Sequence, residues 1–579
     1  MSQVITNRSA IVASLLAAGF ASADPGSVRV VALSGQPVPG TPPGVTFQFF
    51  GLPGPAFKAP LIGDSGAVAF LATLQGPGVG PDNNIALVAY RNNALELVAR
   101  TGDQAPGAPA GYRFHELDPN QGESIKMNDW GRTVFLARLR DPAGTRRDDL
   151  TVWTEGQGSL APFRFLSPDM PEFFYEIEHP VINDPGTIAF HGIIRQPPGS
   201  PAIGGLFTDA GGIPTRVTNL FGTVAGINDD GDVLGTGASG VLLASDDDLT
   251  KLVYAGLPVP GAPPDSHIRS SGGNLRLSEK SFAFIGTMEG PHITPDSDRG
   301  VMAGPLGNFS LRAREGQPAP GTPDGVSLRL FRDGTGDPDV LNVNASGHVA
   351  FIDRLEGPGV NSSNATGIWT DLAGSLSLVA REGDPAPGTE RGTIISTIYI
   401  NFVEYTLAIN DRGQGIFGAG VENPNSQIVN ARTLWWFDAT GNFRVLLRDG
   451  DVIDTNPDPA STTLRTIGLL NPNGASLNEQ GQVAVRVFFT DGTDAILIAQ
   501  IPCPADLTGS SDPSDDSFGR PDGDADTDDF LYFLDAFAQQ SLRHCDLGST
   551  DQGSLVLPDG ICDGDDFFRY LDLFAAGCN

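Results

Sequence analysis

One short pattern recurs along most of this 579-residue chain and limits the folds open to it more than any other feature. The pattern is Asn-x-x-Gly, two further residues, and Ala-Phe; its clearest copies begin at Asn183 and Asn344. The remaining copies begin at Asn128, Asn228, Asn410 and Asn478, or end at Phe70 and Phe284. Eight copies spaced along residues 26–500 predict a repeat architecture.

The residue types in the pattern predict a tight hairpin. Asn and Asp side chains bond to nearby backbone at the start of a turn. Gly adopts the positive φ that closes such a turn before the next strand. The apolar run that follows, such as Val349–Ile352, is typical of a short buried strand. Each copy therefore predicts a strand, a turn and a second strand.

A second pattern alternates with the first. Its best copy runs from Arg381 to Gly388, and an apolar stretch precedes it. Proline cannot pair within a central strand, so this segment is predicted to be a connection. An arginine recurs at one position of the repeat, and we expect it to pair with an acid of a neighbouring unit. These arginines are Arg100, Arg314, Arg381 and Arg448.

Each unit of about 65 residues then contains four strands, which is typical of a propeller blade. We predict a mainly β protein, a closed β-propeller of eight four-stranded blades over residues 24–502. The last blade has no fourth strand after residues 495–498, whereas residues 28–32 form a spare strand of that type. Pairing the two would close the ring and remove an exposed edge. Seven blades, or two smaller β domains, remain alternatives.

The N-terminus predicts export. One arginine precedes the apolar residues 9–23, and Ala21-Ser22-Ala23 fits a signal-peptidase site. We predict a signal peptide over residues 1–23, no transmembrane segment in the mature chain, and a secreted or cell-surface location. A buried helix or an uncleaved anchor is the alternative. The net charge of −33 argues against nucleic acid as a partner.

All four cysteines lie in the last 77 residues, at Cys503, Cys545, Cys562 and Cys578. An even, clustered number in an exported chain predicts disulfides in a small terminal module, residues 503–579. Zinc is the alternative, but no pair has CxxC spacing. Of the three possible pairings, we favour Cys503–Cys578 with Cys545–Cys562.

The same module is rich in aspartate, with 17 Asp among residues 503–579. Two copies of Asp-Gly-x-x-Asp-x-x-Asp lie 37 residues apart, and each leads into a segment with apolar residues at helical spacing. Calcium prefers six to eight oxygen ligands from such loops. We predict two calcium ions, with ligands at Asp506, Asp522, Asp526, Asp529, Asp546, Asp559, Asp563 and Asp566. A merely solvated acidic tail is the alternative.

Two resemblances follow from these motifs. The repeat resembles tandem-repeat bacterial surface or secreted proteins named for Asn-x-x-Gly-x-x-Ala-Phe, a family that implies no known activity. The tail resembles a dockerin, and more closely the EF-hand-like, GC-type dockerin-like domain of planctomycete bacteria, which ends in Gly577-Cys578 here. Each loop departs from the ordinary dockerin, because about ten extra residues separate its first predicted ligand from its second, Asp506 from Asp522 and Asp546 from Asp559.

Together these features predict a non-catalytic binding protein, secreted or on the cell surface. The propeller would present a face to a glycan or protein ligand, and the dockerin-like tail would attach to a cohesin-like partner or the cell envelope. No catalytic residue and no organic cofactor are assigned. The alternative is an extracellular polysaccharide-degrading hydrolase or lyase carried by a dockerin.

Overall fold

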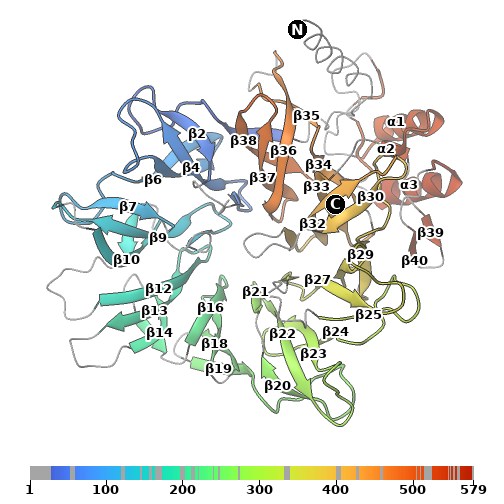
Figure 1. Ribbon diagram of the computed structural model, residues 1–579, viewed down its shortest axis with the longest axis horizontal. Helices are drawn as coiled ribbons and strands as arrows, with labels where there is room; N and C mark the ends of the chain where they lie inside the picture. Colours follow the sequence, from blue (N-terminus) through green and yellow to red (C-terminus); the bar gives the residue numbers. More distant parts are fainter. Residues whose placement is uncertain are drawn as a thin grey trace, which may run out of the picture.

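A computed structural model shows eight antiparallel sheets that follow one another along the chain and surround a common centre (Figure 1). The described residues are 28–51, 59–118, 124–143, 146–155, 160–163, 173–195, 203–209, 215–218, 221–238, 240–245, 248–271, 274–330, 340–398, 406–425, 430–441, 443–456, 461–503, 505–508, 510–513, 525–545, 547, 549–551, 554–556 and 561–576. The predicted signal peptide, residues 1–23, lies outside them.

The first four sheets, blades 1 to 4, are formed as follows. Blade 1 contains β2 (Thr46–Phe50), β3 (Leu61–Ile62), β4 (Val68–Gln75), β5 (Ile85–Arg91) and β6 (Ala94–Arg100). Blade 2 contains β7 (Arg113–Leu117), β8 (Ile125–Met127), β9 (Thr133–Arg140), β10 (Arg146–Thr154) and β11 (Ala161–Phe163). Blade 3 contains β12 (Phe173–Ile182), β13 (Ile188–Arg195), β14 (Ile203–Thr208) and β15 (Thr215–Thr218). Blade 4 contains β16 (Phe221–Ile227), β17 (Val233–Gly237), β18 (Gly240–Ser245) and β19 (Asp248–Val253).

Blades 5 to 8 repeat the plan. Blade 5 contains β20 (His267–Ser271), β21 (Arg276–Ser278), β22 (Ser281–Glu289), β23 (Arg299–Pro305) and β24 (Ser310–Arg314). Blade 6 contains β25 (Ser327–Leu328), β26 (Leu341–Val343), β27 (Val349–Glu356), β28 (Thr366–Thr370) and β29 (Ser377–Arg381). Blade 7 contains β30 (Ile394–Ile398), β31 (Leu407–Ile409), β32 (Gln414–Glu422), β33 (Ala431–Asp438) and β34 (Phe443–Arg448). Blade 8 contains β35 (Val452–Asp454), β36 (Leu464–Leu477), β37 (Gln482–Phe489), β38 (Asp494–Gln500) and β1 (Val28–Leu33).

The predicted eight-bladed propeller is therefore confirmed, as is its closure. Strand β1 pairs antiparallel with β38, with Val28 opposite Ala499 and Leu33 opposite Ala495. Figure 1 shows the first and last sheets side by side. The N-terminal strand thus supplies the outermost strand of blade 8 and covers an edge of β38 that would otherwise be open.

The hydrophobic core lies between neighbouring blades rather than within one. One cluster joins Val31 and Ile496 of blade 8 to Phe47 and Val88 of blade 1. Because both faces of each sheet are covered, the strands read as continuous apolar runs; in β4 every residue except the last is buried.

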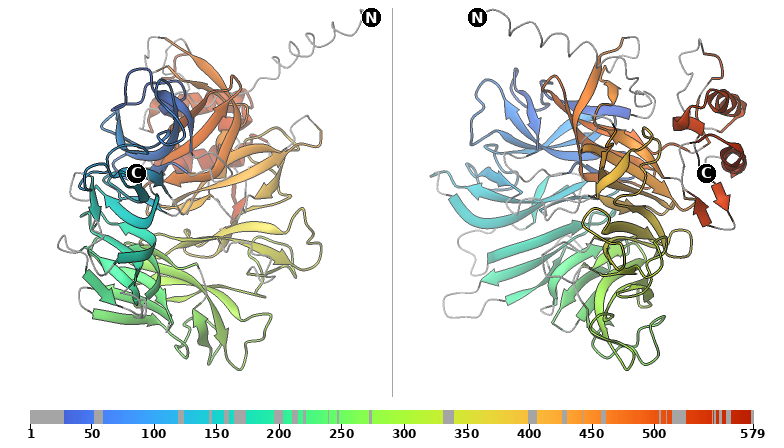
Figure 2. Two further views of the ribbon diagram at one scale, coloured as in Figure 1. Left: turned by 60° about the vertical axis from the view of Figure 1, so that its left-hand side comes forward. Right: turned by 45° about the vertical axis from the view of Figure 1, so that its right-hand side comes forward.

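The C-terminal residues form a separate small core outside the ring, beside the later blades (Figure 2). It contains α1 (Thr527–Ala538), α2 (Leu542–Cys545), β39 (Ser549–Asp551), β40 (Ser554–Val556) and α3 (Gly564–Ala576). The rings of Phe533 and Tyr570 stack between the two longer helices, with centroids 3.9 Å apart. Within the described ranges, no helix is both long enough and apolar enough to cross a membrane.

Candidate functional site

The Asn residues of the repeated turns link each blade to the next. In Asn183 the side-chain Oδ1 accepts a hydrogen bond from the Thr187 N–H at 2.7 Å, which closes the turn as predicted. Its Nδ2 donates to the main-chain oxygen of Asn228 in the following blade at 2.9 Å. The same Nδ2 bond to the next blade is made by Asn128, Asn228, Asn344, Asn410 and Asn478. All six Asn residues are buried, so these hydrogen bonds are shielded from water.

The two blades that lack this Asn use other donors. At the junction of blades 1 and 2, the Ser65 N–H donates to the main-chain oxygen of Asp129 at 2.9 Å. At the junction of blades 5 and 6, the Ser281 hydroxyl donates to the main-chain oxygen of Ala345 at 2.8 Å. All eight junctions are therefore bridged, and the eight turns lie on one face of the ring, which we call the turn face.

Seven of the eight turns place a carboxylate on the turn face, next to the Asn position. We call this set the carboxylate ring: Asp64, Asp129, Asp184, Asp229, Glu279, Asp411 and Glu479. Most members accept a hydrogen bond from the backbone of the preceding blade; for example, the Asp129 N–H donates to Asp184 Oδ1 at 2.8 Å. The same bond joins Asp184 to Asp229, Asp229 to Glu279, Ala345 to Asp411, Asp411 to Glu479, and Glu479 to Asp64. Blade 6 has Ala345 in place of an acid.

The ring holds its carboxylates close enough to perturb one another. Desolvation, followed by the charges of Asp64 and Asp184, raises the pKa of Asp129 to about 7, although this side chain remains partly exposed. Desolvation also raises the pKa of Glu479 to about 7, where the amide of Asp411 opposes the shift and nearby carboxylates add to it. The pKa values of Asp184 and Glu279 are raised for the same first reason. Part of the ring is therefore protonated near neutral pH.

An exposed tryptophan lies beside the ring. Trp130 follows Asp129 in the turn of blade 2 and is 56% exposed, an unusual degree for this residue type. The Arg132 guanidinium lies 5.7 Å from the centroid of its ring. An aromatic surface next to carboxylates is suited to ligands that carry positive charge.

The sequence did not predict this ring, although the printed residues hold the signal. The acid directly follows the turn Asn, or its substitute, in seven copies of the repeat. The prediction for the arginines is wrong for two of them: Arg100 and Arg381 donate to main-chain oxygens of Asn83 and Asn364 within their own blades. Arg448 does pair with an acid, but with Asp451, three residues away.

In the C-terminal module, two of the predicted calcium ligands accept hydrogen bonds from backbone amides. Asp529 Oδ1 accepts from the N–H groups of Leu507 and Thr508, at 2.5 and 2.7 Å, and its Oδ2 accepts from the Asp526 N–H at 2.8 Å. This carboxylate fastens the preceding loop to the start of α1. Desolvation raises its pKa.

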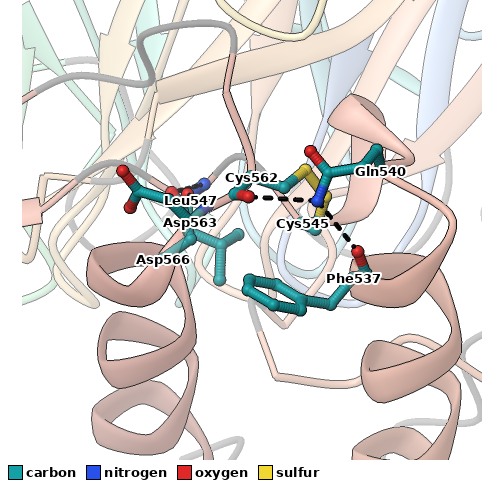
Figure 3. The surroundings of a disulfide bond; sticks show 7 residues. All are labelled: Phe537, Gln540, Cys545, Leu547, Cys562, Asp563 and Asp566. Atoms are coloured by element: carbon teal, nitrogen blue, oxygen red, sulfur yellow. Dashed lines mark hydrogen bonds between the residues drawn. A yellow bond between two sulfur atoms is a disulfide. The ribbon is translucent and has the colours of Figure 1, made fainter.

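Asp566 repeats this arrangement in the second half of the module. Its Oδ1 accepts from the Leu547 N–H at 2.7 Å and its Oδ2 from the Asp563 N–H at 2.8 Å (Figure 3). Both carboxylates thus accept backbone amide hydrogen bonds that tie each loop to the helix that follows it.

The other predicted ligands are only partly described. Asp506 is buried, whereas Asp526 and Asp563 begin the two longer helices. Asp522, Asp546 and Asp559 lie outside the described residues. Among the residues that the structure covers, no group of three or more His, Cys, Asp or Glu is arranged to hold a metal. Calcium binding stays a prediction.

A disulfide joins Cys545 to Cys562, with the Cα atoms 5.5 Å apart, as the favoured pairing predicts (Figure 3). The Gln540 side chain donates to the Cys562 main-chain oxygen at 3.1 Å and connects the end of α1 to this bond. Cys503 is also disulfide-bonded; Cys578, its predicted partner, lies outside the described residues.

Comparisons with known proteins bear on family and shape. The model of a family of unknown function, DUF7453, matches residues 4–162 and 217–508. A search of curated proteins found no match. Among solved structures, the polysaccharide lyase Uly1 is similar at 10% identity and a TM-score of 0.37, covering 82% of this chain and 99% of that one. The β-propeller domain of the Trilobed protease from Pyrococcus furiosus is similar at 9% identity and a TM-score of 0.32, covering 65% and 95%. At these values the similarities carry no inference about chemistry.

Proposed function

We propose that this chain, which belongs to the DUF7453 family of unknown function, is an extracellular, non-catalytic binding protein that takes up a positively charged partner on its turn face. The observation that carries the proposal is the carboxylate ring, in which seven acids are held together by the repeat. Like charges at close range raise the free energy of the folded state unless the groups are protonated or a counter-charge is present.

The ring contains more charge than blade closure needs. Blade 6 has Ala345 at the acidic position, yet its junctions are still bridged by Ser281 and by Asn344. An amide or hydroxyl oxygen could accept the same backbone N–H without bringing a charge. Asp129 makes the point most clearly, because its backbone oxygen forms the link to blade 1 while its carboxylate is left on the surface. We infer that the carboxylates that blade closure does not require serve to bind the positively charged partner.

The C-terminal module would serve as the anchor, as its dockerin-like sequence implies. Leu531 of α1 and Phe568 of α3 are 46% and 65% exposed, which gives both helices an apolar surface for a cohesin-like or envelope partner. Arg569 donates to the Thr440 main-chain oxygen of blade 7 at 2.6 Å, so the module also touches the propeller. Calcium, if bound, would order the loops that precede the helices.

Titration of the purified chain with hexalysine peptide tests the proposal. Binding is expected at low ionic strength and should weaken steeply as salt rises, because exposed charges are screened beyond about 10 Å at 0.1 M. Absence of binding at low salt would contradict the proposal. Cleavage of a polysaccharide by the same preparation would instead favour the hydrolase or lyase alternative.

A further inference from the structure

A polar pocket opens on the turn face where blade 8 meets blade 1. Its volume is about 400 Å³, at the lower end of the range for small-molecule sites, about 300–1,000 Å³. Four segments line it: the start of β1, the turn after β3, the hairpin between β5 and β6, and the turn after β36. Arg29 of β1, the strand that closes the ring, forms part of the pocket wall.

The hairpin supplies two side-chain amides. Asn92 and Asn93 form its two-residue turn, with φ values of 50° and 62° in the left-handed region that Asn tolerates. Asn93 Oδ1 accepts from the Tyr90 hydroxyl at 3.1 Å and from Arg29 at 3.3 Å. The Asn92 side chain has no hydrogen-bond partner among the described residues, so its donor and acceptor are both available to a ligand.

The two charged residues of the pocket have opposite sign. The Arg29 guanidinium lies 5.2 Å from the centroid of the Tyr90 ring and donates one hydrogen bond to Asn93. One oxygen of Asp64 accepts the Glu479 N–H at 2.8 Å, which leaves the second oxygen without a described partner. Gln480 and Gln482 also line the pocket, which therefore offers both donors and acceptors and little apolar surface.

This mixture favours one class of ligand. A sugar hydroxyl is both donor and acceptor, and amides together with an Arg and an Asp satisfy both roles. An anionic ligand is disfavoured, because Asp64 lines the pocket and Glu479, the next acid of the carboxylate ring, donates its backbone N–H to Asp64. We propose that the pocket binds one unit of a neutral saccharide. This ligand differs in chemistry from the positively charged partner proposed above, although Asp64 belongs to both sites.

The experiment is a calorimetric titration of the full chain with methyl glycosides of glucose, galactose, mannose and N-acetylglucosamine. Glucuronic acid and glycine serve as the anionic and zwitterionic probes. We expect one neutral sugar to bind with a Kd on the order of millimolar and the other two probes not to bind. Asn92→Gly retains the left-handed turn but removes the amide, and should weaken binding about tenfold.

Asn430→Gly is the matched control, because Asn430 is an exposed Asn with φ of 49° on another blade. It should bind the sugar as the unmodified chain does, and both variants should retain the melting temperature. The proposal is overturned if no neutral sugar binds, if glucuronic acid or glycine binds more tightly, or if Asn92→Gly binds unchanged. Hexalysine binding is measured on the same samples, so failure of this pocket is distinguished from failure of the proposed function.

Discussion

The Asn478 side chain donates a hydrogen bond to the main-chain oxygen of Gly63 at 2.9 Å, across 415 residues of sequence. This bond joins the last repeated turn to the first, just as each of the other turn asparagines joins its own blade to the next. It lies on the turn face, whereas the β1–β38 pairing closes the same junction at the outer edge of blade 8. The ring is thus closed twice, at its inner and outer strands.

Loss of one inter-blade asparagine should destabilise the whole propeller. Asn344→Ala removes the bond from Nδ2 to the Asn410 oxygen and the bond from the His348 N–H to Oδ1, and both lie in a buried turn. We expect the free energy of unfolding to fall by about 1–3 kcal/mol. Urea unfolding followed by tryptophan fluorescence measures it. Asn425→Ala, on an exposed residue, is the control and should change stability by less than about 0.5 kcal/mol.

Removal of β1 should be far more damaging than an ordinary terminal truncation. A chain that begins at Ser34 lacks Val31 and Ala32, which are buried between blades 8 and 1. Compared with a chain that begins at Val28, it should lose about 4 kcal/mol of stability or more. The same melting temperature for both chains would show that β1 does not close the ring in solution.

The ring should make stability depend on pH in a defined direction. Because the pKa of Asp129 is raised to about 7, the folded chain holds this proton more tightly than the unfolded chain does. The stabilisation of the folded chain by this proton is fully present below about pH 4 and is lost as the pH rises through 7. Asp129→Asn has no carboxyl group at this position and so avoids this pH-dependent loss of stability. The variant should melt about 1–2 °C above the unmodified chain at pH 8 and show a smaller difference at pH 5.

Scanning calorimetry at both pH values measures this difference. Asp324→Asn is the control, since Asp324 is exposed and lies outside the carboxylate ring. A larger difference at pH 5 than at pH 8 would contradict the assigned pKa direction for Asp129.

In the C-terminal module, Asp529→Ala should loosen α1 even in a calcium chelator. The substitution leaves the N–H groups of Leu507 and Thr508 without their acceptor, at a cost of about 2–4 kcal/mol locally. Hydrogen exchange of residues 527–538 reports it, with Asp535→Ala on the exposed side of the helix as the control. If the loss appears only when calcium is present, the carboxylate acts as a metal ligand instead.

Much of the fold could be predicted because the repeated turn is local chemistry. The Asn183 bond to Thr187 and the positive φ of Gly186 follow from residue type alone. The second bond of Asn183, to the Asn228 main-chain oxygen, could not be predicted without knowing how the blades pack. Every residue has a main-chain oxygen, so the residue types give no sign of which one accepts the bond. The prediction for Arg100 failed for the same reason, since its acceptor is the Asn83 carbonyl.

The carboxylate ring could not be predicted as a candidate site because its acids recur at one position of the repeat. A residue repeated at one position suggests a structural role, and the acids of the ring do accept structural hydrogen bonds. Their second property, the accumulated charge, appears only when the blades are arranged in a ring and the turns face one another. Asp529 shows the reverse case: its spacing predicts a metal ligand, which stays a prediction, and gave no sign of the three backbone donors that the fold supplies.

The most direct test of the binding role compares two triple variants in the hexalysine titration. The ring variant is Asp129→Asn, Asp229→Asn and Asp411→Asn; the control is Asp248→Asn, Asp324→Asn and Glu390→Gln, which removes three exposed acids elsewhere on the propeller. The titration is done at pH 9, where Asp129 is ionised, so that both variants change the net charge equally. We predict that the ring variant binds at least about tenfold more weakly at low salt and that the control binds almost as the unmodified chain does. Equal weakening in both variants would show that hexalysine responds only to net charge, and would contradict a binding role for the turn face.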